Sequence, residues 1–155
     1  MTATSVANVQ EHFDRLTQRP GLATTFYRIL FATAPELRPL FPNDLYALST
    51  HFESMLKQAI ENLGRMTAMD SALRELGIRH MRYGAQPHHY PVVLDVLLQA
   101  LKEHSGEDWN DALATDWRLA ILAIVVPMLR GAAVETAELA QRLASEDSVD
   151  IRSNF

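Results

Sequence analysis

Histidine is the candidate metal-binding residue type of this 155-residue chain, and two of its six histidines lie on or beside the apolar face of a predicted helix. His80 comes seven residues after Leu73 and four after Leu76, so it faces the interior with them. His51 lies beside the apolar positions of an earlier helix. Because a buried histidine is often satisfied by hydrogen bonds inside a core, the residues alone leave both core packing and metal ligation open for His80.

The remaining histidines give weaker indications of a site. His12 and His104 have polar neighbours in the sequence, and we expect both at the surface. His88 and His89 lie in a predicted corner before a helix. The chain has no cysteine, which excludes disulfides and thiolate ligands, including a thiolate-ligated haem.

Length and composition indicate one soluble domain that is long enough to bury a substantial core. The net charge of −5 and the absence of a basic run argue against a nucleic-acid partner. The longest apolar run, residues 119–129, is too short to span a bilayer and ends at Arg130, so we expect no membrane partner. The N-terminus lacks a charged start followed by an apolar run, and we expect a cytoplasmic protein without a signal peptide.

The hydrophobic pattern is helical nearly throughout and shows no strand-like alternation. Helices are predicted over about residues 6–16, 22–34, 35–41, 45–63, 71–81 and 90–104, and from 111 or 115 onward. Ser5, Asp44 and Asp70 are the candidate N-caps. We expect Gly64 to end the fourth helix and residues 84–87 to form a corner.

The last helix carries the apolar run 119–129, which we expect to be buried on most sides because it is apolar all round. Pro127 lies inside this run and should kink the helix, since the carbonyl of Ala123 loses its hydrogen-bond partner. The predicted organisation is a single domain over residues 1–155, with a frayed tail from about residue 145.

Four motifs follow one another along this helical chain: Phe26-Tyr27, the segment from Pro35 to Phe41, Arg79-His80, and Tyr90 ten residues after His80. In these motifs the chain resembles bacterial single-domain globins of the Vitreoscilla haemoglobin and flavohaemoglobin type. The similarity runs without obvious gaps over about residues 22–101 and continues more weakly through Trp117 and Met128. The resemblance implies an all-α globin fold packed around haem b, with reversible binding of O2, NO or CO.

The resemblance also assigns roles to individual residues. His80 would hold the iron and leave the opposite face of the haem open. Tyr27 would face that open side, where its buried phenol needs a partner that a gas ligand could supply. Phe41 would pack against the porphyrin, Arg79 could reach a propionate, and Tyr90 could form a hydrogen bond near His80. The other residues expected to line the haem are Leu48, His51, Phe52, Met55, Leu76, Val93 and Leu97.

The chain departs from the family pattern on the distal side. Leu48 stands where the family usually has Gln, Phe52 where it has Leu, and His51 where it has Lys. We expect His51 at the pocket edge, beside a propionate, because three residues place it roughly 60° around the helix from Leu48. Ligation of the iron by His51 and simple exposure to solvent remain alternatives.

A second departure lies on the proximal side. Ala132 stands where the family has a Glu on its last helix, with Glu135 nearly one turn further on, and Ile121 replaces a Tyr. Without that hydrogen-bond network, flavohaemoglobin-like redox catalysis is less favoured. Any dioxygenase-like or peroxidase-like turnover would need a separate reductase.

Three functions fit the sequence. The first is a haem protein that binds O2, NO or CO reversibly. The second is a redox or NO-scavenging haem protein with both His80 and His51 on the iron. The third is a haem-free globin-like signalling module, which the combination of His80, Tyr27 and Phe41 disfavours. The sequence does not distinguish oxygen storage, delivery, sensing and NO detoxification, and it leaves the oligomeric state open.

Overall fold

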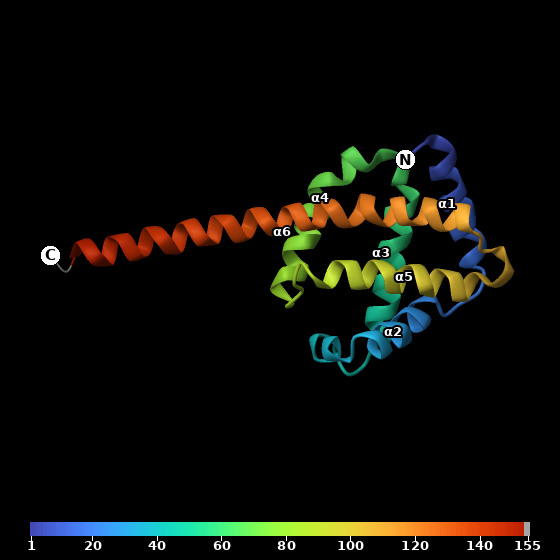
Figure 1. The fold of residues 1–155 in the computed structure, drawn as a ribbon, viewed down its shortest axis with the longest axis horizontal. Helices are drawn as coiled ribbons and strands as arrows, with labels where there is room; N and C mark the ends of the chain where they lie inside the picture. Colours follow the sequence, from blue (N-terminus) through green and yellow to red (C-terminus); the bar gives the residue numbers. More distant parts are fainter. Residues whose placement is uncertain (154–155) are drawn as a thin grey trace.

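A computed structural model gives the fold, which it describes for residues 1–153, with side chains over residues 1–146 (Figure 1). Within this range the chain is all helical and has no strand, as predicted. The elements are α1 (Ala3–Leu16), α2 (Leu22–Thr33), the 3-10 helix η1 (Pro35–Leu40), α3 (Tyr46–Glu61), η2 (Leu63–Arg65), α4 (Met66–Arg82), α5 (His89–Ser105), η3 (Gly106–Asp108) and α6 (Asp111–Ser153).

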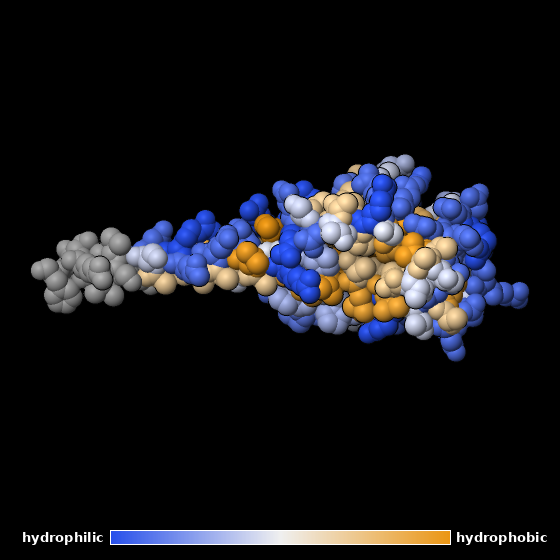
Figure 2. All heavy atoms as spheres, turned by 90° about the horizontal axis from the view of Figure 1, so that it is seen from above, coloured by the Kyte–Doolittle hydropathy of each residue, from blue (hydrophilic) through white to orange (hydrophobic). Residues whose placement is uncertain are grey.

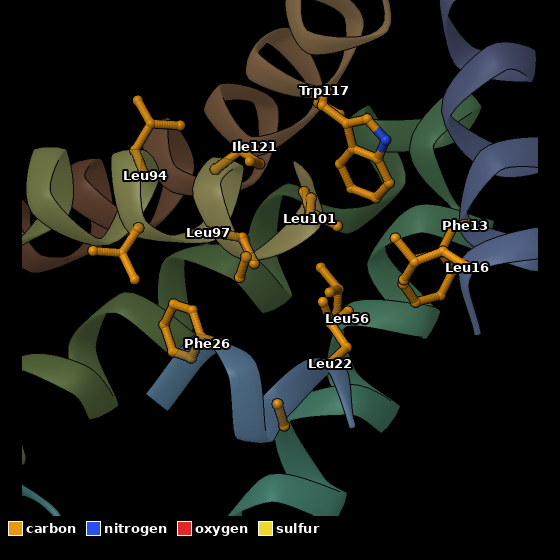
Figure 3. Packing of buried hydrophobic residues seen from close by; sticks show 14 of the residues in the cluster. Phe13, Leu16, Leu22, Phe26, Leu56, Leu94, Leu97, Leu101, Trp117 and Ile121 are labelled. Atoms are coloured by element: carbon orange, nitrogen blue, oxygen red, sulfur yellow. The ribbon is translucent and has the colours of Figure 1, made fainter. Parts of the chain in front are cut away.

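The most extensive helix contacts in the body are those of α4 with α6 and of α2 with α5. α2 also packs against α3, while α1 contacts both α6 and α3. α5 and α6 cross in front of α3 in Figure 1, and the second half of α6 continues beyond the body. Buried side chains from α1, α2, α3, α5 and α6 form one core, in which Trp117 and Leu101 are fully enclosed (Figure 3).

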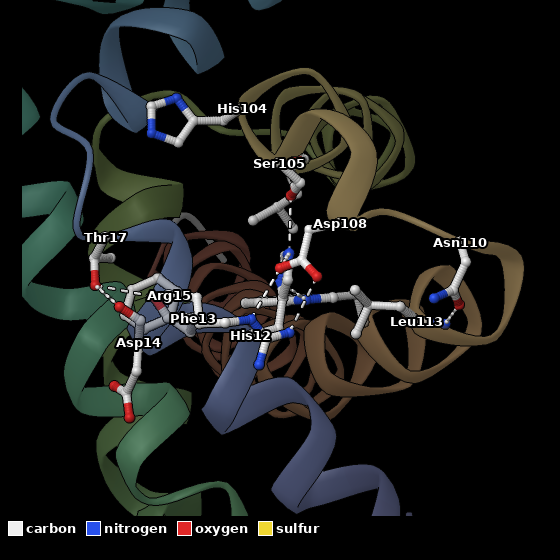
Figure 4. A network of polar contacts seen from close by, with 12 residues as sticks. His12, Phe13, Asp14, Arg15, Thr17, His104, Ser105, Asp108, Asn110 and Leu113 are labelled. Atoms are coloured by element: carbon white, nitrogen blue, oxygen red, sulfur yellow. Dashed lines mark hydrogen bonds and ion pairs between the residues drawn. The ribbon is translucent and has the colours of Figure 1, made fainter.

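Local hydrogen bonds explain where several helices begin. The hydroxyl of Thr2, and not that of Ser5 as expected, accepts a hydrogen bond from the amide of Ser5 (3.0 Å) and caps α1. Asp44 acts as predicted, since its Oδ1 accepts from the amide of Tyr46 (2.9 Å) at the start of α3. Asn110 does the same for α6, accepting from the amide of Leu113 at 2.9 Å (Figure 4).

α4 begins earlier than expected. The sequence predicted a start at Ser71 with Asp70 as the cap, but the helix begins at Met66 and Asp70 lies inside it. There the carboxylate of Asp70 pairs with Arg74 one turn later, at 2.8 Å. An ion pair at this spacing supports a helix, so the acidic residue is a helix-interior partner rather than a boundary.

α4 and α6 touch through two glycines. A Cβ on Gly77 would lie 1.9 Å from the carbonyl oxygen of Met128, and a Cβ on Gly131 would lie 2.1 Å from the carbonyl oxygen of Arg74. Any larger side chain would therefore separate the two backbones. Gly77 lies three residues before His80, so this close crossing fixes the position of the helix that carries the candidate ligand.

α6 is longer than the apolar run suggested. It continues as a helix through Pro127 to Ser153, and fraying from about residue 145 stays a prediction. The segment after Gly131 contains neither glycine nor proline and is rich in Ala, Leu, Glu, Gln and Arg, which are strong helix formers. The apolar run 119–129 is also less buried than predicted, because only one side of α6 meets the core, and Leu119 is 42% exposed.

Within residues 1–146, α6 is the one helix whose length and composition would allow it to cross a membrane, over Asp111–Glu146. The long core helix of a water-soluble protein can meet the same criterion, so this feature is weak support for a membrane span.

His12 is fully buried, and the expectation that it lies at the surface is wrong. Its polar neighbours point elsewhere, whereas His12 lies three residues after Val9 and shares the core face of α1 with Phe13 and Leu16. His104 also departs from expectation, since it is half-buried and its Nε2 lies 3.0 Å from the carbonyl oxygen of Arg19.

Candidate haem site

The candidate site contains residues from α2, α3, α4 and α5 and from the turn after η1. α2 contributes Tyr27, the turn after η1 contributes Phe41, α4 contributes His80, and α3 and α5 contribute apolar side chains. α3 packs against α2 and α1, whereas α4 packs mainly against α6. Several apolar side chains on α3, α4 and α5 are only partly buried in this part of the molecule.

His80 is held in one orientation by its own helix. Its Nδ1 lies 2.9 Å from the carbonyl oxygen of Leu76, which can only accept, so Nδ1 carries the proton. The other nitrogen, Nε2, has no hydrogen-bond partner among the described side chains. Burial lowers the pKa of His80, and the neighbouring Arg79 adds to this, while the Leu76 carbonyl opposes it. The neutral ring thus offers a free lone pair at Nε2, which is the form that binds a metal.

Tyr27 is buried, and its hydroxyl has no hydrogen-bond partner among the described residues. Four aromatic rings surround it, with centroids 5.2 to 6.1 Å away: Phe26, Phe31, Phe41 and Phe52. Burial raises the pKa of Tyr27 to about 12, so the phenol keeps its proton at any physiological pH. The structure therefore presents one hydrogen-bond donor within an aromatic surrounding.

Most of the apolar residues expected to line the haem share one property, which is partial exposure. The half-buried residues are Phe41, Leu48, Phe52, Met55, Leu76 and Val93. Apolar side chains that are neither in the core nor at the outer surface are what a flat apolar group between helices would cover. Leu97 differs, because it is only 5% exposed and belongs to the main core.

The charged and polar residues expected at the haem edge are exposed. His51 is exposed on α3, which is compatible with an edge position and equally with a histidine that simply faces solvent. Arg79 is exposed and forms no ion pair within the described residues, so its guanidinium is free to pair with an anionic group.

Tyr90 carries an unusual feature on the proximal side. Its hydroxyl is enclosed yet has no hydrogen-bond partner among the described residues, and burial raises its pKa. An enclosed hydroxyl without a partner is costly, so a bound group with an acceptor would stabilise it. Glu135 does not supply the missing partner of the Tyr90 hydroxyl, since its carboxylate lies 3.7 Å from Arg82. Ile121, which replaces the family's Tyr, is buried in the core and has no polar group to offer.

Two residues that position the site were not singled out from the sequence. Arg38 donates hydrogen bonds to the carbonyl oxygens of Phe41 (3.2 Å), Pro42 (2.9 Å) and Asn43 (3.1 Å), and so fixes the turn that carries Phe41. Glu53 on α3 accepts a hydrogen bond from the amide of Ala23 (2.9 Å) at the start of α2. Both residues act through contacts outside their own helical turns, which the sequence pattern does not indicate.

These features fit a haem. A neutral imidazole with a free Nε2, an enclosed phenol without a partner and a set of half-buried apolar side chains are what an axial ligand and a porphyrin would satisfy. Among residues 1–146, no cluster of three or more His, Asp or Glu side chains could hold a free metal ion. A metal held by His80 would therefore take its other ligands from a cofactor.

Comparison with known proteins finds chains of similar sequence and fold. The chain is 27% identical over 143 residues to leghemoglobin-1 of Lupinus luteus, covering 81% of this chain and 93% of that protein. It is 26% identical to the engineered carbene transferase RmaNOD from Rhodothermus marinus, with a TM-score of 0.76 and coverage of 90% of this chain and 99% of that one. A bacterial globin from Campylobacter jejuni, 21% identical, shares the fold with a TM-score of 0.77, over 88% of this chain and 99% of that one.

The family assignment rests on the match of residues 24–128 to the Globin family model, which spans more than half of the chain. This range contains Tyr27, Phe41, His80 and Tyr90, and the family implies a haem cofactor. The fold expected from the sequence is confirmed, and the chain belongs to the globin family.

Proposed function

We propose that this globin binds haem b through His80 and reversibly binds a diatomic gas on the face beside Tyr27. The proposal rests on one observation above all, the hydrogen bond from Nδ1 of His80 to the carbonyl of Leu76, which fixes the tautomer and leaves Nε2 for iron. When bound, the haem supplies an iron with one open coordination position.

The chain's own residues would determine what happens at that position. Tyr27 holds a proton that it can donate to the gas, since burial keeps its pKa near 12. Phe52 stacks on Phe26 with ring centroids 4.8 Å apart, and this aromatic wall excludes water from the distal side. Arg79 and His51, both exposed, would pair with the propionates.

A His80→Ala variant tests the role of the imidazole. We expect the purified variant to lose most of its bound haem and its Soret absorbance, and we expect added imidazole to restore part of the spectrum. His88→Ala is the matched control, because His88 is exposed in the corner before α5 and should retain haem. Full haem occupancy with an unchanged ferrous spectrum in His80→Ala would show that another residue holds the iron.

A Tyr27→Phe variant tests the gas-binding side. One hydrogen bond to a partly charged ligand contributes about 1.5–3 kcal/mol, which is roughly a 10- to 100-fold change in a rate constant. We expect O2 to dissociate faster by about that factor and CO to change less, measured by stopped-flow spectroscopy. Equal small changes for both gases would mean that the phenol does not reach the ligand.

Several finer features belong to the same proposal. The order of motifs favours a globin of the Vitreoscilla haemoglobin and flavohaemoglobin type. A cytoplasmic location stays a prediction. NO scavenging is the second candidate, since the similar protein RmaNOD from Rhodothermus marinus is a putative nitric oxide dioxygenase. Turnover of that kind would need a separate reductase, and consumption of NO only when a reductase is supplied would favour it.

A further inference from the structure

The outer side of α6 is apolar along most of its length. We define the outer stripe as eight positions separated alternately by three and four residues: Leu119, Leu122, Val126, Leu129, Ala133, Thr136, Ala140 and Leu143. Seven of the eight are apolar, and Leu119, Val126 and Leu143 are 42%, 36% and 53% exposed. In Figure 2, hydrophobic side chains on the body continue along one edge of the protruding part of the molecule.

Only part of the stripe contacts the body: Leu122 packs against the core, and the hydroxyl of Thr136 lies 3.3 Å from the Sδ atom of Met81 on α4. The core side of α6 carries Trp117, Ile121 and Met128, which are buried. Beyond Gly131, the continuation of that core side is mostly polar, with Glu135, Glu138, Arg142 and Glu146, and it also carries the exposed Leu139. Thr136, the one polar member of the stripe, donates to the carbonyl of Ala132 (2.8 Å) and does not require water.

The 3–4 spacing indicates what covers the stripe. Apolar residues that repeat every 3.5 positions are the pattern by which one helix packs along another. A stripe on a single helix is also self-complementary, because a two-fold axis places the same residues of two copies against each other. We infer that the outer stripe of α6 is the contact through which two copies of this chain form a dimer.

A membrane surface fits the helix less well. Helices that lie on membranes carry Lys and Arg on their polar side, which attract anionic lipids. The polar side of the protruding part of α6 instead carries three glutamates against one arginine, and the whole chain has a net charge of −5. The charge therefore favours a protein partner over an anionic bilayer.

The size of the stripe limits the strength of the dimer. From residue 119 to residue 143 the helix is about 37 Å long, and a contact about 10 Å wide would bury roughly 400 Å² on each copy. Stable interfaces bury about 800 Å² on each partner. We therefore expect a reversible dimer whose population depends on protein concentration.

Sedimentation of the haem-loaded full chain over a wide range of concentrations tests this inference. The average mass should rise from 17.4 kDa toward twice that value. Leu143→Glu and Val126→Glu each place a charge in the contact and should weaken dimerisation about tenfold or more. Ser145→Glu is the matched control, because it adds the same charge to an exposed position on the opposite side of the helix and should leave dimerisation unchanged.

Three results would overturn the inference. A monomer at every concentration would mean that the stripe does not bind a second copy. A dimer that withstands both Leu143→Glu and Val126→Glu would place the interface elsewhere. Binding to phosphatidylcholine or phosphatidylglycerol vesicles that is lost in Leu143→Glu would assign the stripe to a bilayer. Because the Soret spectrum reports haem binding separately, none of these results depends on the proposed gas-binding function.

Discussion

Two histidines of this globin have opposite surroundings. His80 is half-buried, donates from Nδ1 to the carbonyl of Leu76, and has no partner for Nε2 within the described residues. His12 is fully buried and uses both nitrogens, since Nδ1 accepts from the indole of Trp117 (2.8 Å) and Nε2 lies 2.9 Å from the hydroxyl of Ser105. Figure 4 shows His12 between α1 and the segment that contains Ser105 and Asp108.

The comparison shows that burial alone does not identify a ligand. The deeper histidine, His12, is a structural residue, because the indole of Trp117 can only donate and therefore fixes the proton of His12 on Nε2. The Nε2 proton of His12 is donated to the hydroxyl oxygen of Ser105. The hydroxyl of Ser105 in turn donates its own proton to the carbonyl oxygen of Leu101. A ligand must keep one nitrogen free, and His80 meets that condition.

The largest expected effect on stability comes from Gly77→Ala, which changes the packing of the helix that carries His80 and leaves the surroundings of His12 unchanged. The new Cβ would lie 1.9 Å from the Met128 carbonyl oxygen, so α4 must move away from α6. We expect the free energy of unfolding to fall by about 3 kcal/mol or more, together with weaker haem binding. Gly64→Ala is the control, because its Cβ would meet Val6 at 3.9 Å, and urea unfolding of the two variants measures the difference.

Trp117→Phe changes the surroundings of His12 instead. The change leaves Nδ1 of His12 without its donor and replaces a fully buried indole with a smaller ring. We expect a loss of about 2–4 kcal/mol in the free energy of unfolding, with an unaltered visible spectrum of the haem-loaded protein. Trp109→Phe is the comparison variant and should cost less, since Trp109 is half-buried and its ring is tilted against that of His12 without a hydrogen bond to it. An altered spectrum in Trp117→Phe would show that the two regions are coupled.

The sequence could predict the fold because most helix boundaries depend on local features. Asp44 and the break after Leu16 are such features, and the helical period of the apolar residues predicted the other α-helices. The short helices η2 and η3 were not predicted, and α4 begins at Met66 instead of Ser71. The position of His12 could also have been inferred, because its spacing to Val9 places it on the core face. Attention to its sequence neighbours instead of its helical neighbours led to the wrong prediction.

The residues of the candidate site were harder to predict from the sequence than the fold. The candidate ligand and the distal phenol came from the family resemblance, since spacing alone left His80 open between core and ligand. Arg38 and Glu53 act through contacts with a turn and with another helix, and no local pattern reports such contacts. The same holds for Gly77, whose role depends on a helix about fifty residues away in the sequence.

A smaller effect is expected from pH. Burial lowers the pKa of His12, Arg15 adds to this, and Asp108, at 4.0 Å, opposes it. Between the lowered folded pKa and the ordinary value near 6.5, the unfolded chain binds more protons, so stability falls as the pH falls through this window. The slope from one histidine is at most about 1.4 kcal/mol per pH unit. Urea midpoints of haem-loaded His12→Gln should show a shallower pH dependence than those of the wild type, and an equal slope would assign the effect to another group.

The smallest expected effect concerns His51. It distinguishes a histidine that binds the iron, as proposed for His80, from a histidine that only lies near the haem. His51 is exposed on α3, whereas a second axial ligand would have to turn into a region lined by Leu48 and Phe52. Nothing in the structure draws the ring inward, and a propionate at the edge would hold it outside. His51→Ala should therefore leave the spin state of the ferric haem unchanged, as read from its visible and electron paramagnetic resonance spectra. A low-spin wild-type spectrum that becomes high-spin in His51→Ala would show that His51 binds iron, and the molecule would then have two ligand histidines beside one structural one.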